Sequence, residues 1–217
     1  MKKIICLHGY AMNRVWLQSW LDQLQQRLGN DYQLHYPQGP IECPAEAVRA
    51  MGVRLSMPLP EERIGAGKNW CWYRADEARP PTYHQIERSL DYLADYFAQL
   101  GPIDGVIGWS QGAVMSAILS ALRENRSTHR FDFNWAILCG GFLPGDARYR
   151  PMFDPPLKLP TLHISGIKES DFMREQATNL IAAFSNPARL NTPCGHIMPV
   201  KHPEYMDSIA DWIRHRP

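Results

Sequence analysis

The residues best suited to chemistry lie in the stretch Gly108-Trp109-Ser110-Gln111-Gly112. This stretch follows an apolar run and precedes apolar residues at helical spacing, which predicts a strand, a sharp turn and a helix. The Gly-x-Ser-x-Gly nucleophile elbow needs this context, because its strained turn presents a serine hydroxyl at the end of a sheet. Glycines flank the serine because the strand and the helix approach too closely for side chains. The pattern predicts Ser110 as a nucleophile.

A serine hydroxyl needs a general base, and that base needs a carboxylate to orient it. Behind a nucleophile elbow the expected chain order is serine, acid, histidine. His196 follows the last predicted strand, where a loop at the carboxyl edge of the sheet can bring its imidazole to Ser110, so we expect it to be the base. The weaker candidates are His202 as second choice, His163 as a core residue in an apolar strand, His129 as a surface residue and His215 in the tail.

The acid is open between two residues. The predicted strand 161–165 ends at Gly166, and the acid is expected on the loop after that strand. Glu169 and Asp171 both lie there, and either carboxylate can hold an imidazole in the required tautomer. The residue types alone give a slight preference for Asp171.

An oxyanion hole is expected from two backbone N–H groups. One belongs to Gln111, the residue after the nucleophile, and the other is expected from Tyr10 in Leu7-His8-Gly9-Tyr10 at the end of the first strand. Gly9 lets that loop fold close to the bound acyl group, whereas His8 is expected to hold the loop by hydrogen bonds rather than to catalyse. This chemistry requires no cofactor and no metal.

The remaining pattern supplies a scaffold for these residues. Strands are predicted at 3–7, 32–36, 106–109, 135–139, 161–165 and 188–192, and helices at 15–28, 83–100, after Ser110, at 174–184 and at 203–214. Thr82 and Gln85 match a capping box for the helix that is predicted to begin at Tyr83. Alternating strands and helices predict one α/β domain over 1–217, with a mostly parallel sheet and helices on both faces.

Between residues 38 and 81 the periodicity breaks down among many prolines and glycines, which predicts a long irregular excursion. The excursion contains an aromatic cluster at Trp70, Trp72 and Tyr73. Two interpretations are equally good: these rings wall an apolar acyl or aryl pocket as a lid-like element, or they cover the edge of the sheet.

Composition sets the outer limits. The 217 residues are 45% hydrophobic and 21% charged, with a net charge of +1, which gives no reason to invoke nucleic acid or an anionic membrane as a partner. The five cysteines show no C-x-x-C spacing, which argues against structural zinc and a disulfide framework. The first apolar run is too short for a signal peptide and none is long enough to span a bilayer. We expect a cytoplasmic protein, and the sequence does not indicate its oligomeric state.

Three motifs carry a resemblance to a known family: Leu-His-Gly-Tyr-Ala-Met-Asn near the start, Gly-Trp-Ser-Gln-Gly-Ala in the middle and Gly-His-Ile-Met-Pro near the end. With these the chain resembles, over nearly its whole length, the fungal-type serine hydrolase (FSH) family of the α/β-hydrolases. The resemblance implies a small esterase or thioesterase with a Ser-Asp-His triad, Ser110 as nucleophile, His196 as base and backbone donors at Tyr10 and Gln111.

The chain departs from the family pattern at two positions. The family reads Gly-x-x-Asp after the penultimate strand, and the third residue after Gly166 is here Glu169, with aspartate only at Asp171. An ungapped comparison therefore favours Glu169, while residue type favours Asp171. Trp109 replaces a more usual phenylalanine, which is expected to narrow the acyl side of the substrate pocket.

Taken together, the sequence predicts a serine hydrolase that cleaves carboxylic ester or thioester bonds of small acyl substrates through an acyl-enzyme. The Gly-x-Ser-Gln-Gly core also occurs in acyl-protein thioesterases and related carboxylesterases, so a thioesterase of that kind stays open. A peptidase or C–C hydrolase with the same triad is a further possibility. From a different class, a non-catalytic ligand-binding or interaction module on a hydrolase scaffold is the alternative, because fold does not fix function.

Overall fold

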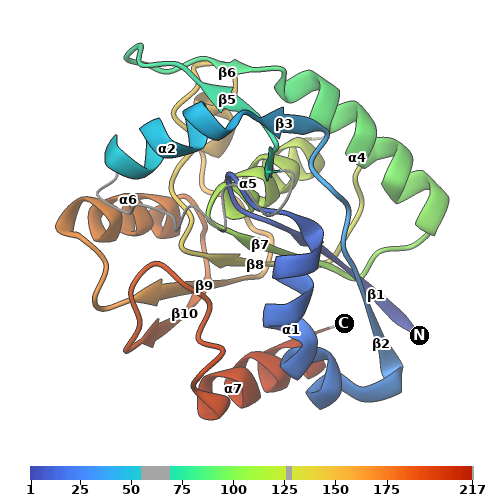
Figure 1. Ribbon diagram of the computed structural model, residues 1–217. Coiled ribbons are helices and arrows are strands. Elements are labelled where there is room, and N and C mark those ends of the chain that lie inside the picture. Colours follow the sequence, from blue (N-terminus) through green and yellow to red (C-terminus); the bar gives the residue numbers. More distant parts are fainter. Residues whose placement is uncertain (55–68, 126–128, 217) are drawn as a thin grey trace.

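A computed structural model describes residues 1–54, 69–125 and 129–216 (Figure 1). The part of the predicted excursion between residues 55 and 68 lies outside the described residues. At the centre is a sheet in the order β10-β9-β8-β7-β1-β2. Its strands are β1 (Lys2–Leu7), β2 (Tyr32–His35), β7 (Gly105–Trp109), β8 (Trp135–Cys139), β9 (Thr161–Gly166) and β10 (Pro187–Thr192). All neighbouring pairs are parallel, so their carboxyl ends share one edge.

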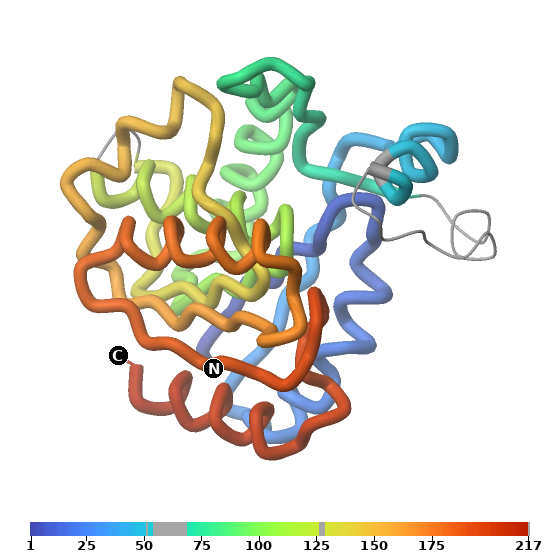
Figure 2. Tube along the Cα trace, turned by 90° about the vertical axis from the view of Figure 1, so that its left-hand side faces the viewer, coloured from blue at the N-terminus to red at the C-terminus, as the bar shows by residue number. Residues whose placement is uncertain are grey.

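Helices cover both faces of this sheet, as Figures 1 and 2 show. On one face lie α1 (Arg14–Leu28) and α7 (Pro203–Arg214), whose buried side chains share a core cluster with β1 and β8. On the other lie α4 (Ile86–Leu100), α5 (Gln111–Glu124) and α6 (Asp171–Ala182). Figure 2 shows α7 in red and α4 in green on opposite sides of the sheet. The predicted architecture of a parallel sheet between two helical layers is therefore present.

The helices follow from their sequences. α1 buries Leu17, Leu21, Leu24 and Leu28, one residue every three or four, and the Asn13 side chain caps it by accepting from the Trp16 N–H. α5 is buried from Gln111 through Ala121, because it lies directly against the sheet. Small residues such as Gly112, Ala113 and Ala117 allow this close approach. α5 thus fixes the direction in which the chain leaves Ser110.

Two helix starts differ from the sequence-based prediction. The proposed capping box of Thr82 and Gln85 is wrong: α4 begins at Ile86, and Gln85 adopts a left-handed backbone with no side-chain cap. α6 begins at Asp171 rather than near Arg174, because the Ser170 hydroxyl accepts from the Met173 N–H and caps the helix three residues earlier. This earlier start decides where Asp171 points.

The 38–81 excursion is more ordered than predicted. It contains β3 (Ile41–Cys43), α2 (Ala45–Arg54), β4 (Asn69–Cys71) and β5 (Arg74–Ala75). β3 pairs antiparallel with β4, and β5 pairs antiparallel with β6 (Tyr83–His84). A bridge between Met12 and Trp70 joins β4 to the loop after β1. The excursion is therefore attached to the carboxyl edge of the sheet.

Candidate active site

Ser110 occupies the turn between β7 and α5 with φ 53° and ψ −117°. A side-chain-bearing residue rarely adopts this conformation, so the surrounding contacts must hold it. A Cβ added to Gly112 would lie 2.1 Å from the Leu7 carbonyl oxygen, and one added to Gly108 would lie 2.3 Å from the Gly112 carbonyl oxygen. Both glycines are thus required by the contacts at the turn, as the elbow motif predicts.

His196 lies on the loop after β10 and reaches Ser110. Its Nε2 is 2.9 Å from the Ser110 Oγ, and its Nδ1 is 2.7 Å from Glu169 Oε1. The imidazole is 11% exposed and the Glu169 carboxylate 2% exposed. Hydroxyl, imidazole and carboxylate therefore form one continuous chain of hydrogen bonds, drawn from three loops that lie at the same edge of the sheet.

The structure separates the two candidate acids. Glu169 lies on the loop after β9 and contacts His196, whereas Asp171 is the first residue of α6, with a side chain 95% exposed and ion-paired to Arg174. The slight preference for Asp171 is therefore not supported. Because Ser170 caps α6, Asp171 faces solvent at the helix N-terminus, where its charge is favourable. The Glu169 Oε2 is buried and has no hydrogen-bond partner among the described residues.

The loop after β1 crosses directly above the nucleophile. A Cβ on Gly9 would lie 3.4 Å from the Ser110 Cβ, so the backbone that leads into Tyr10 passes close to the Ser110 side chain. Gln111 is the first residue of α5, and its N–H has no acceptor within the helix. The two backbone groups predicted for the oxyanion hole belong to segments that meet at Ser110.

His8 supports this loop from within. It is fully buried; its Nδ1 is 2.8 Å from the Gly9 carbonyl oxygen, and its Nε2 accepts from the Gly39 N–H at 2.9 Å. The acceptor role of Nε2 leaves the proton on Nδ1. Burial lowers the pKa of His8 to about 4, so the ring is neutral at pH 7. The ring ties the oxyanion loop to the excursion, which matches the expected non-catalytic role.

Among the described residues, none of the weaker histidine candidates makes a hydrogen bond with Ser110. His163 is buried in β9 beside Thr161, and burial lowers its pKa to about 4. His202 precedes α7 without capping it through its side chain and lies 3.4 Å from Glu204, while His129 and His215 are exposed.

Two of the aromatic residues assigned to a substrate pocket are core residues. Trp72 is fully buried and donates its indole N–H to the His8 carbonyl oxygen, and Tyr73 is 2% exposed and stacks on Tyr83 at 4.0 Å. The Gln111 side chain binds both of their backbones, accepting from Trp72 N and donating to Tyr73 O. Of the two interpretations, covering the sheet edge is therefore the better one for this pair. Trp70 is only half-buried.

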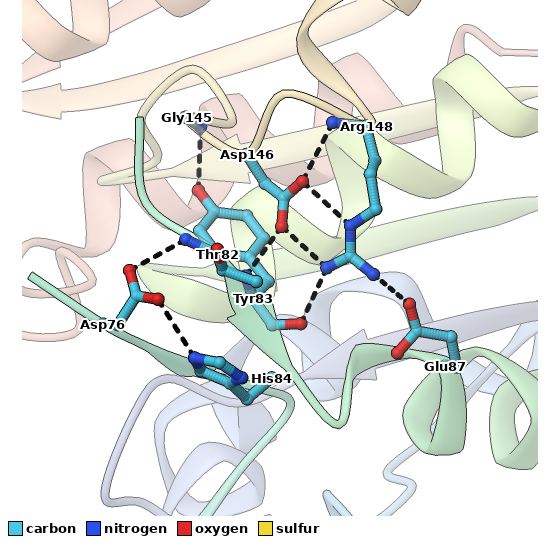
Figure 3. A network of polar contacts seen from close by, with 8 residues as sticks. All are labelled: Asp76, Thr82, Tyr83, His84, Glu87, Gly145, Asp146 and Arg148. Atoms are coloured by element: carbon cyan, nitrogen blue, oxygen red, sulfur yellow. Dashed lines mark hydrogen bonds and ion pairs between the residues drawn. The ribbon is translucent and has the colours of Figure 1, made fainter. Parts of the chain in front are cut away.

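A polar network that the sequence did not predict joins β6, just after the excursion, to the loop after β8 (Figure 3). Asp146 is 2% exposed; its carboxylate accepts from the Tyr83 N–H at 2.6 Å and from the Arg148 guanidinium at 2.7 and 3.0 Å. Arg148 also binds the Tyr83 carbonyl oxygen and Glu87, and the Tyr83 hydroxyl accepts from Gly145 N. The hydrogen bonds from Arg148 hold the pKa of Asp146 down to about 2.

No local sequence signal marks this network, because the two segments that it joins are far apart in the chain: Tyr83 and Asp146 are separated by 63 positions. Its connection to the candidate site is indirect but continuous. The network holds Tyr83, Tyr83 stacks on Tyr73, and the Tyr73 backbone is bound by Gln111 beside the nucleophile.

A family model described as "Serine hydrolase (FSH1)" matches residues 1–207 of this chain. The relatives include a Bos taurus protein named esterase OVCA2, 28% identical over 225 residues that cover 96% of this chain and 97% of that protein. A Schizosaccharomyces pombe protein named as an uncharacterized hydrolase is 28% identical over 97% of this chain. The chain spans half the length of that protein (50%) and 46% of a second S. pombe relative.

Among solved structures, acyl-protein thioesterase 2 of Zea mays is similar with a TM-score of 0.63 at 18% identity, covering 98% of this chain and 92% of that one. The structure of a protein named esterase PE8 gives a TM-score of 0.63 at 20% identity. At these identities the likeness shows the fold, which is that of the α/β-hydrolases. No helix in the described ranges is both long and apolar enough to cross a membrane.

Proposed function

Because the chain belongs to the serine hydrolase (FSH1) family, we propose that Ser110, His196 and Glu169 form its catalytic triad and cleave carboxylic ester or thioester bonds of small acyl substrates. The observation that carries the proposal is the hydrogen-bonded series from Ser110 Oγ through the His196 ring to Glu169 Oε1, at 2.9 and 2.7 Å. The relatives named as esterases support ester cleavage, and the fold shared with an acyl-protein thioesterase is compatible with thioesters.

In the proposed mechanism, Ser110 Oγ attacks the acyl carbonyl carbon while its proton passes to His196 Nε2. The N–H groups of Gln111 and Tyr10 stabilise the oxyanion, and removal of one such donor elsewhere costs roughly 3 kcal/mol of transition-state stabilisation. The imidazolium returns the proton to the departing alcohol or thiol, which leaves an acyl-Ser110. Water, deprotonated by His196, then attacks the acyl carbonyl and releases the acid and the free serine.

Glu169 has two tasks in this cycle. Its Oε1 accepts a hydrogen bond from the Nδ1–H of His196, which keeps the proton on Nδ1 and leaves the Nε2 lone pair directed at Ser110. Its negative charge also balances the imidazolium, and burial strengthens that attraction because little water screens it.

We also propose a cytoplasmic location. The support comes from the sequence, because an odd number of cysteines without C-x-x-C spacing does not match the disulfide frameworks of secreted proteins.

The proposal is tested with p-nitrophenyl esters, matched acyl thioesters and a fluorophosphonate probe. Ser110→Ala is expected to abolish turnover of both substrate classes and to remove probe labelling. Ser19→Ala, which removes a hydroxyl on the outer face of α1, serves as the control and retains both. Labelling of the folded protein at another residue, or turnover by the Ser110→Ala variant, would reject the nucleophile. Absence of labelling in the unmutated protein would favour a non-catalytic binding module.

A further inference from the structure

Trp109, the residue before the nucleophile, lies against the imidazole of His196. The two ring centroids are 5.3 Å apart and the ring planes meet at 41°. From the sequence, Trp109 is expected on the acyl side of the substrate pocket. In the structure it also lies beside His196, the group that moves the proton.

The indole is fixed from two further sides. Trp20 of α1 meets it edge-on, with centroids 5.0 Å apart and planes at 82°. On the side of the oxyanion loop, a Cβ on Gly9 would lie 2.3 and 2.4 Å from two carbon atoms of the ring, so the indole touches the bare glycine backbone. A ring held in this way has little freedom to rotate away from His196.

The indole N–H gives a second indication that position matters here. It is buried and has no hydrogen-bond partner among the described residues. A buried donor without a partner is normally avoided, because its lost hydration is not replaced. The packing of the ring against His196, Trp20 and Gly9 is thus maintained although the indole N–H loses its hydrogen bond to water.

We propose that Trp109 is a positioning residue for His196, whose indole face holds the imidazole with Nε2 directed at Ser110 and stabilises the imidazolium formed during serine attack. The inference rests on the proposed function. When Ser110 Oγ bonds to the acyl carbon, its proton moves to His196 Nε2 and the ring gains one positive charge. Glu169 meets that charge at the Nδ1 edge, and the electron-rich face of Trp109 meets it from the side of the ring.

This role makes a specific prediction for substitutions. Trp109→Leu removes the aromatic face, and cation–π attraction of the usual strength then corresponds to a kcat lower by roughly 3- to 30-fold. The KM for p-nitrophenyl acetate should stay within about twofold, because the lost contact is to His196 and not to the acetyl group. Trp109→Phe retains an aromatic face and should restore most of the kcat. Trp212→Leu is the matched control for loss of a half-buried tryptophan, because Trp212 packs on Trp135 at the start of β8.

A second readout is independent of turnover. In a Ser110→Ala background, the ring-carbon protons of His196 should show an upfield NMR ring-current shift that Trp109→Leu removes and Trp109→Phe partly keeps. The two hypotheses can fail separately. If the proposed function is wrong, the Ser110→Ala variant retains turnover, but the ring-current shift at His196 is still present. The positioning role is overturned if the shift is unchanged in Trp109→Leu. It is also overturned if that variant alters KM and acyl-chain preference at an unchanged kcat, which would make Trp109 a wall of the substrate pocket.

Discussion

Glu169 and Asp146 are both buried carboxylates, yet their surroundings differ sharply. Asp146 has both oxygens bound, by the backbone N–H of Tyr83 and by the backbone and guanidinium of Arg148. Glu169 has one oxygen bound to His196, and its Oε2 is buried with no partner in the described part of the chain. A carboxylate with donors at both oxygens is suited to stabilising the fold. When only one oxygen has a partner, the negative charge interacts mainly with that partner, which for Glu169 is the His196 imidazole.

The contrast has a physical basis in what each group must do. The charge of Asp146 is already neutralised by Arg148, so no further charge needs to develop near it. Glu169 orients the neutral imidazole, and its charge matters most when that imidazole becomes positive, when a second fixed donor at Oε2 would weaken the attraction. Replacement of the carboxylate by an amide should therefore lower activity but not stability at Glu169, and should lower stability far more than activity at Asp146.

The largest effect is expected from Glu169→Gln. The new amide can donate to His196 Nδ1, which would place the imidazole proton on Nε2 and prevent it from accepting the Ser110 proton. By analogy with other triads, kcat should fall by about 10³- to 10⁴-fold. The free energy of unfolding should stay equal or rise, because a buried charge with an unpartnered oxygen is removed. Steady-state kinetics and urea unfolding measure the two quantities.

Asp171→Asn is the matched control for this substitution. Its carboxylate is exposed, so kcat should be unchanged. A large loss of kcat in Asp171→Asn, together with a retained rate in Glu169→Gln, would return the role of acid to Asp171.

The reverse outcome is expected for Asp146→Asn. The amide nitrogen or oxygen replaces a charged acceptor in front of Arg148, and the loss should destabilise the protein by roughly 2–3 kcal/mol. This is below the usual cost of breaking a buried ion pair, because the Arg148 side chain is 45% exposed and can turn towards water. The kcat should fall less than tenfold. Thermal or urea unfolding tests the stability, and a kcat loss as large as that of Glu169→Gln would abolish the distinction between the two carboxylates.

The same contrast explains what the sequence could predict. The succession of strands and helices, the elbow and His196 follow from periodicity and from short motifs, because each is encoded in residues that are neighbours in the chain. The choice of Glu169 over Asp171 depends on Ser170 capping α6, a matter of a few residues at a helix end, where local patterns are least reliable.

Contacts between residues far apart in the chain could not be predicted from local patterns. Asp146 pairs with Tyr83 across 63 positions, and Trp72 meets His8 across 64, so nothing near either residue indicates its partner. The aromatic cluster was visible in the sequence, but its burial depends on how the excursion folds back over the sheet edge. Local sequence thus indicated the chemistry, and tertiary contacts determined which residues support it.

The smallest predicted effect concerns acid stability. The pKa of Asp146 is held at about 2 in the fold, against about 3.9 for an unperturbed aspartate. The unfolded chain therefore binds a proton at higher pH than the folded one. This contribution to stability is fully present above about pH 5 and is lost as the pH falls through 4 towards 2, in total about 2.5 kcal/mol.

His8 and His163 contribute in a different pH window, which allows the effect of Asp146 to be separated. Burial lowers the pKa of both imidazoles to about 4, so their contributions decline as the pH falls from about 6.5 towards 4. Urea unfolding of the parent protein and of Asp146→Asn at a series of pH values should give curves that run parallel between pH 7 and 5 and converge below pH 4. Parallel curves down to pH 2 would show that Asp146 is not held ionised by Arg148. The proposed difference between Asp146, with donors at both oxygens, and Glu169, with a donor at one, would then lose its electrostatic basis.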